Sequence, residues 1–189
     1  MVILNIPVTQ NDHIRGPAHA PITLVEDGDY ECPHCAAAHP IVDQVQLSFG
    51  GRMRFVFRHF PLTEIHPHAE IAAESAEIAG AAGLFWDMHD ALFENQSSLS
   101  VPTIFLIGAQ LGLPEAIMRN ALETGQYRKC AAISWAAYAA ARMALRLSSS
   151  TVCGMMVLTI THLWYLESKC ASPPMRVHNG FTRERLRSA

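Results

Sequence analysis

The pattern of apolar and polar positions changes period early in the chain. The segment ITLVED (22–27) is a short apolar run rich in β-branched residues, which predicts a strand buried on both faces. After a Gly-Asp turn signal the period becomes helical from Cys32 onward, and Ile41, Val45 and Phe49 are expected to share the buried face of this helix.

A second strand is predicted immediately after this helix. In RMRFVFRHFPL (52–62) three apolar residues alternate with arginines, which is typical of a strand with one buried face that ends at Pro61. Several helical stripes follow, over about residues 63–125. The order strand, helix, strand and then helices predicts an α/β fold built on a βαβ unit with a helical insertion.

Composition narrows the functional classes. The chain has 189 residues and a formal charge of −3, and half of its residues are apolar, so neither a disordered chain nor a nucleic-acid-binding surface is expected. The longest apolar run (151–166) is shorter than a membrane span and contains His162, and residues 1–12 lack the basic start of a signal peptide. We therefore expect no membrane partner and a cytoplasmic location.

Cysteine spacing identifies the first candidate chemistry. Of the five cysteines, only Cys32 and Cys35 lie close together, in the motif Cys-Pro-His-Cys. Cys32 is expected in the first turn of its helix, where free N–H groups and the helix dipole favour a thiolate. Pro33 suits that turn because it needs no N–H partner, and His34 adds a donor or a positive charge beside the sulfur.

The remaining site residues follow from the chemistry of a dithiol. A stabilised Cys32 thiolate makes the disulfide form an oxidant, and Cys35, one turn further along, is placed to resolve a mixed disulfide. Glu26, near the end of the first strand, is a candidate proton acceptor for Cys35 through water. An ordinary carboxylate at a strand end is the alternative for Glu26.

Two other interpretations of the cysteine pair are a zinc site and inert core cysteines. A structural zinc site usually has four ligands in two pairs, and the possible second pair is His66 with His68 or the isolated cysteines after residue 129. We expect His66 and His68 instead to cap and begin a helix. The alternative function is therefore a non-catalytic metal-binding or partner-binding protein that uses Cys32, Cys35 and histidines.

With these motifs in place, the chain resembles the DsbA-like branch of the thioredoxin-fold oxidoreductases over about residues 12–127. The segments GPAHAPITLVEDGDYECPHC, FRHFPL with HPHA, and LFWDMHDALFENQ carry the resemblance, together with Pro40. It implies a thioredoxin-like fold for residues 1–128, a nucleophilic Cys32, a resolving Cys35 and a buried acid at Glu26. Its expected partners are protein or small-molecule dithiols and disulfides, without cofactor or metal. The oligomeric state is not predicted.

The resemblance stops at the C-terminal end of the chain. Residues 129–189 lack the cis-proline loop, β-hairpin and last helix of the family, so we expect an incomplete fold, an aberrant tail and impaired activity or folding. Read in a displaced codon frame, residues 142–157 permit NGTPTFFINGVRHDG, which matches the missing loop and hairpin. We therefore hypothesise a frameshift near residues 128–130, and we expect this tail to be the least ordered part of the chain.

Overall fold

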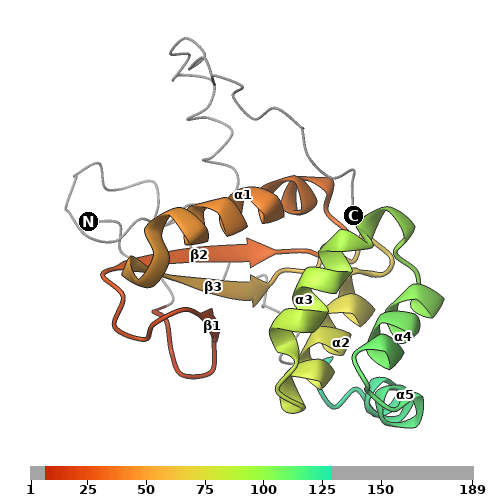
Figure 1. Cartoon of the computed structure of the whole chain (residues 1–189). Helices are drawn as coiled ribbons and strands as arrows, with labels where there is room; N and C mark the ends of the chain where they lie inside the picture. The colour runs from red at the N-terminus through yellow and green to blue at the C-terminus, as the bar shows by residue number, and fades with distance from the viewer. Residues whose placement is uncertain (1–6, 129–189) are drawn as a thin grey trace, which may run out of the picture.

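A computed structural model describes residues 7–128, and the expectations for 129–189 lie outside the described residues. The predicted βαβ unit is present: β2 (Ile22–Gly28) leads through α1 (Pro33–Phe49) to β3 (Met53–His59). β2 and β3 pair in parallel, with Leu24 opposite Phe55 and Gly28 opposite His59. Because the strands are parallel and in register, their carboxyl ends meet at one edge of the sheet (Figure 1).

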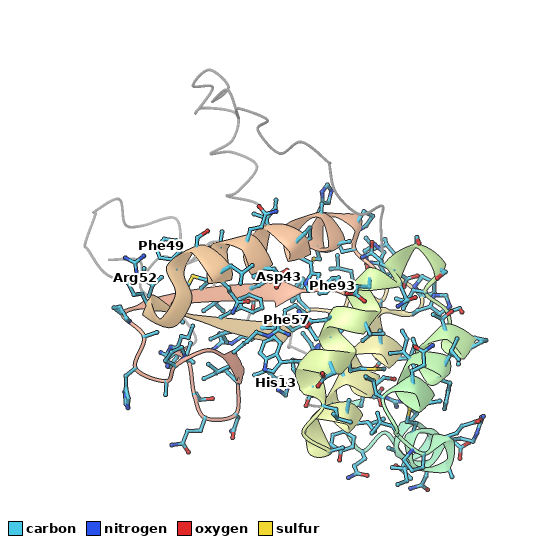
Figure 2. The ribbon with its side chains drawn as sticks, viewed as in Figure 1. His13, Asp43, Phe49, Arg52, Phe57 and Phe93 are labelled. Atoms are coloured by element: carbon cyan, nitrogen blue, oxygen red, sulfur yellow. The ribbon has the colours of Figure 1, made fainter. Side chains whose placement is uncertain are left out.

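A third strand was not predicted. β1 (His13–Arg15) pairs antiparallel with β3, which gives the strand order β1-β3-β2 in the described part of the chain. A strand of three residues is too short to show a hydrophobic period, so pattern analysis misses it. It places the side chain of His13 at the edge of the sheet, facing the helices that follow β3 (Figure 2).

Helices gather at the carboxyl ends of β2 and β3 (Figure 1). They are α2 (Ala69–Ala81), α3 (Phe85–Glu94), α4 (Val101–Gln110) and α5 (Glu115–Thr124), with a short 3₁₀ turn, η2 (Gln96–Ser98), between α3 and α4. A second 3₁₀ turn, η1 (Gly50–Arg52), joins α1 to the beginning of β3. α2 and α3 pack against each other and their apolar faces join one core with the sheet. No helix in this part of the chain combines the length and apolar character that crossing a membrane requires.

The buried face of α1 differs from the predicted one. Ile41 and Phe49 are more than a third exposed, whereas Cys35 and Ala38 are buried and Val42 and Val45 pack against the core. Ile41, Val45 and Phe49 do lie within about 80° of one another on a helix of 3.6 residues per turn, but Ile41 is at the border of the stripe that faces the core and Phe49 is the last residue of the helix. The observed spacings of three and four keep the buried side chains aligned.

The predicted burial of the two strands holds in part. β2 is buried on both faces along most of its length, as expected. In β3, Met53, Phe55 and Phe57 are buried as predicted, but Val56 on the opposite face is also fully buried. The arginines beside it are only partly exposed, and Arg54 donates to the Thr23 hydroxyl at 2.8 Å. The prediction of a single buried face on β3 was therefore wrong.

Candidate active site

The Cys-Pro-His-Cys motif forms the beginning of α1. Cys32 is the N-cap residue, with extended backbone angles, and Pro33 occupies the first helical turn as predicted. The carbonyl of Cys32 accepts the first helical bond from Ala36 N–H at 3.1 Å. Cys32 is partly exposed, while Pro33 and His34 are exposed. The sulfur of Cys32 therefore sits where helix N–H groups and the helix dipole favour a negative charge.

Cys35 has a contrasting environment. Its side chain is buried, and the backbone N–H of Asp29 points at its sulfur at 3.4 Å. Burial raises the pKa of the Cys35 thiol well above its ordinary value, and the nearby Cys32 and Glu26 raise it further. Both cysteines are free thiols in this structure. The geometry therefore pairs an accessible sulfur with a buried one that retains its proton, as the nucleophilic and resolving roles require.

Glu26 is buried near the end of β2, which leads into the active-site loop (residues 29–31) before Cys32. Burial, with a contribution from Asp27, raises the pKa of Glu26 to about 8. Its Oε1 atom has no hydrogen-bond partner within residues 7–128, and it lies 3.2 Å from the position that a Cβ on Gly28 would occupy. The carboxyl group therefore extends toward the end of the strand, from which the active-site loop departs, and holds a proton at neutral pH.

Asp29 anchors the active-site loop to the segment after β3. Its buried carboxylate accepts from the backbone N–H of Glu31 at 2.8 Å and of Leu62 at 2.8 Å, and it lies 2.7 Å from His66 Nδ1. Three donors on one carboxylate hold both loops in a fixed relation. From the sequence we placed Asp29 only in a turn, although its position directly after the buried strand was a usable signal.

Two further residues missed from the sequence hold the loop from its other side. Glu31, adjacent to Cys32, accepts from the His68 backbone N–H at 2.6 Å and lies 3.0 Å from His68 Nδ1. The side-chain amide of Gln96 donates to the carbonyls of Tyr30 at 2.8 Å and Cys32 at 2.9 Å. These contacts connect residues 37 to 66 positions apart, so no local sequence pattern reveals them.

The histidines predicted to cap a helix have a different role. His68 is the N-cap residue of α2, but its side chain makes no capping bond and pairs with Glu31 instead. His66 lies two residues earlier, outside the helix, and pairs with Asp29. Both histidines therefore connect the helical insertion to the active-site loop.

Comparison with known families agrees with this geometry. A family profile described as Thioredoxin matches residues 8–147, which is most of the chain. The chain therefore belongs to the thioredoxin family, and the predicted thioredoxin-like α/β class is confirmed. The matched range extends twenty residues past position 127, where we expected the resemblance to end.

Solved structures with the same fold include DsbA-like proteins, as predicted. A thioredoxin-like oxidoreductase from Silicibacter pomeroyi aligns with a TM-score of 0.58 at 20% identity, covering 85% of this chain and 92% of that one. BdbD from Bacillus subtilis aligns at 0.61 and 20% identity, covering 76% and 80%. Wolbachia pipientis alpha-DsbA1 aligns at 0.59 and 16% identity, covering 88% and 95%. At these identities the likeness shows the fold.

Curated relatives of higher identity are much longer proteins. The chain is 49% identical over 100 residues to Na(+)/H(+) antiporter NhaA 1 of Salinispora arenicola, a match of 52% of this chain and 15% of the relative. It is 42% identical over 114 residues to NhaA 3 of Salinispora tropica, covering 60% of this chain and 17% of the relative. The chain thus spans about a sixth of the length of these relatives.

Proposed function

We propose that the chain is a thiol–disulfide oxidoreductase in which Cys32 is the nucleophile and Cys35 the resolving thiol. The observation that carries the proposal is the difference between the two sulfurs. Cys32 is partly exposed at a helix N-terminus, whereas Cys35 is buried one turn further along and keeps its proton. That asymmetry suits a dithiol that forms and then resolves a mixed disulfide.

The reaction conserves atoms and electrons without a cofactor. The Cys32 thiolate attacks one sulfur of a substrate disulfide, forms a mixed disulfide and releases the other substrate sulfur as a thiolate. Cys35 then loses its proton and attacks the Cys32 sulfur, which releases the reduced substrate and leaves a Cys32–Cys35 disulfide. Two electrons pass from the dithiol to the substrate, and the reverse sequence oxidises a substrate dithiol.

Glu26 is the proposed proton carrier for the resolving step. Its pKa of about 8 lets it exchange a proton near neutral pH, and in its ionised form it raises the pKa of the Cys35 thiol. His34 and Pro33 are proposed to tune the nucleophile, because both lie in the first turn beside Cys32.

The alternative, a metal-binding site at the cysteines, has less support. Among the described residues, the groups of side chains that converge closely enough to hold a metal contain histidines and carboxylates but neither Cys32 nor Cys35. The proposed substrates are protein or small-molecule dithiols and disulfides, and the proposed location is the cytoplasm. The antiporter activity named for the curated relatives is not proposed here, since the match spans at most 17% of the lengths quoted above.

The proposal is tested by measuring whether the chain reduces the disulfides of a protein such as insulin. Dithiothreitol is present to return the chain to its dithiol form after each turnover. Cys32→Ser is expected to abolish turnover, and Cys35→Ser to accumulate a mixed disulfide visible by mass spectrometry. Cys130→Ser, at an isolated cysteine, is the matched control and should keep both properties. Turnover that survives in Cys32→Ser would overturn the proposal.

A further inference from the structure

A second group of reactive side chains lies outside the dithiol. His13 on β1, His59 at the end of β3 and Glu77 on α2 converge at the junction of the sheet and the helical insertion. Nε2 of His13 lies 2.8 Å from Glu77 Oε1, and Nε2 of His59 lies 3.0 Å from the same oxygen. Three chain segments thus direct two ring nitrogens at a single carboxylate oxygen.

The carboxylate oxygen that the two rings share is largely shielded from solvent. The side chains of Glu77, His13 and His59 are 14%, 24% and 2% exposed. Two ring nitrogens therefore converge on one carboxylate oxygen at a site that water reaches mainly past His13.

We propose that this group is a zinc site, with His13 Nε2, His59 Nε2 and Glu77 Oε1 as ligands and water in the fourth position. Two imidazoles and one carboxylate are a donor set that Zn²⁺ binds well, and the set needs no cysteine thiolate. Bound Zn²⁺ would place a positive charge against the largely buried carboxylate. The site is distinct from the dithiol and does not depend on its proposed activity.

The observed distances are close to those of a loaded site. Tetrahedral zinc with bonds of about 2.0–2.1 Å holds its ligand atoms about 3.3 Å apart. The two nitrogen–oxygen separations are 2.8 and 3.0 Å, and all three ligand atoms lie within 4.8 Å of one another. Small shifts of the three side chains would therefore separate the ligand atoms enough to hold the ion. The His13 side chain is 24% exposed, which gives the ion a route from solvent.

One feature weakens the site. A ring that ligates zinc through Nε2 carries its proton on Nδ1, and Nδ1 of His59 is buried without a partner among the described residues. Zinc-bound histidines normally donate that proton to a second group, and losing such a partner costs about 10–100-fold in affinity. We therefore expect binding that is weaker by this factor than in structural zinc sites, and a role in joining β1, β3 and α2.

Zinc titration of the full chain tests the proposal. The Cys32–Cys35 disulfide is formed first and the remaining thiols are alkylated, so that no thiolate competes for the metal. After dialysis against a chelator, Zn²⁺ is titrated by calorimetry and the melting temperature is followed in parallel. The expected result is one equivalent of zinc that raises the melting temperature, as binding to the folded state requires.

Variants assign that equivalent to the proposed ligands. His13→Ala and Glu77→Gln should lose it or weaken it at least tenfold, and zinc should no longer raise their melting temperature. His19→Ala removes an exposed histidine outside the group and should bind as the unaltered chain does. If Glu77→Gln does not fold, His13→Ala still decides, because His13 lies on a short edge strand. Unchanged stoichiometry and affinity in His13→Ala, or no binding by the unaltered chain, would overturn the proposal.

Discussion

The side-chain amide of Gln96 donates to the backbone carbonyl of Cys32 at 2.9 Å, although the two residues are 64 positions apart. The same amide also donates to the carbonyl of Tyr30 at 2.8 Å. Cys32 is the N-cap of α1, so Gln96 fixes the backbone at the point where the sulfur meets the free helix N–H groups. A residue of the helical insertion therefore helps to position Cys32, the proposed nucleophile.

Replacing Gln96 tests this positioning role. Gln96→Ala removes two hydrogen bonds from partly buried carbonyls, and we expect it to lower the free energy of unfolding by about 1–3 kcal/mol. We also expect Cys32 to alkylate more slowly at neutral pH, because its backbone is less firmly held at the helix start. The matched control is Gln44→Ala, at an exposed glutamine of α1, which should change neither property. If the stability falls as expected but the alkylation rate of Cys32 is unchanged, Gln96 has only a structural role.

Asp29 gives a second prediction for the same loop. Asp29→Asn removes the negative charge that faces His66. It also replaces one carboxylate oxygen with an NH₂ group, which cannot accept, so the three contacts of Asp29 can no longer all be made. Because the carboxylate is buried, we expect a loss of about 2–4 kcal/mol in the free energy of unfolding. Urea denaturation measures this value, and Asp87→Asn, at an exposed aspartate, is the control. A change as small as that of the control would show that the two loops do not depend on Asp29.

Local features of the dithiol could be predicted from the sequence, whereas its supporting contacts could not. Cys32 at the helix start, Pro33 in the first turn and the buried Glu26 follow from residues close together in the chain. The contacts of Glu31 with His68 and of Gln96 with Cys32 join distant segments and depend on how the insertion packs on the sheet. No local pattern of alternation or spacing in the sequence predicts such packing.

The same distinction explains the errors in the fold. The strand β1 was missed because pairing with β3, and not its own composition, makes residues 13–15 a strand. The burial of Val56 also depends on what covers the second face of the sheet, which the alternation of arginines concealed. A continuous apolar run predicts a strand covered on both faces, as in β2, but alternating arginines predict an exposed face even where the rest of that face is covered, as in β3.

Gly28 gives a prediction that depends on close packing. A Cβ at Gly28 would lie 2.4 Å from Cε2 of Phe57, and that ring is buried and packed against Tyr30 and His89. Gly28→Ala is therefore expected to destabilise the fold by about 1–3 kcal/mol. Adding Phe57→Leu should recover part of this loss, because the smaller side chain makes room for the methyl group.

Two controls separate this clash from other effects. Gly51→Ala adds a methyl group where no atom lies within 4 Å, so its stability should be nearly unchanged. Phe57→Leu alone should be destabilising, and its loss should not simply add to that of Gly28→Ala in thermal or urea unfolding. Strict additivity of the two losses would show that the glycine and the ring do not interact.

Glu26 makes the stability of the fold dependent on pH. Its pKa is about 8 in the folded chain, above its ordinary value of 4.5, so the folded state binds the proton more tightly than the unfolded state. Its contribution is fully present below pH 4.5 and is lost as the pH rises through 8. The unfolding free energy should fall over this window by up to about 1.4 kcal/mol per pH unit. Glu26→Gln keeps a neutral, similarly shaped side chain and should remove most of this fall.

Urea unfolding at pH 5 and pH 9 measures the effect of Glu26. We compare the unfolding free energy of Glu26→Gln with that of the unaltered chain at each pH. Between pH 5 and pH 9 this difference should shift by about 3–5 kcal/mol in favour of Glu26→Gln, because at pH 9 only the unaltered chain must bury a charge. Glu64→Gln, at an exposed glutamate, should show no such difference.

In the disulfide assay, Glu26→Gln should slow resolution of the Cys32 mixed disulfide while leaving its formation unchanged, since the buried Cys35 thiol loses its proton carrier. Equal slowing of both steps would contradict the assigned role and point to a general disturbance of the loop.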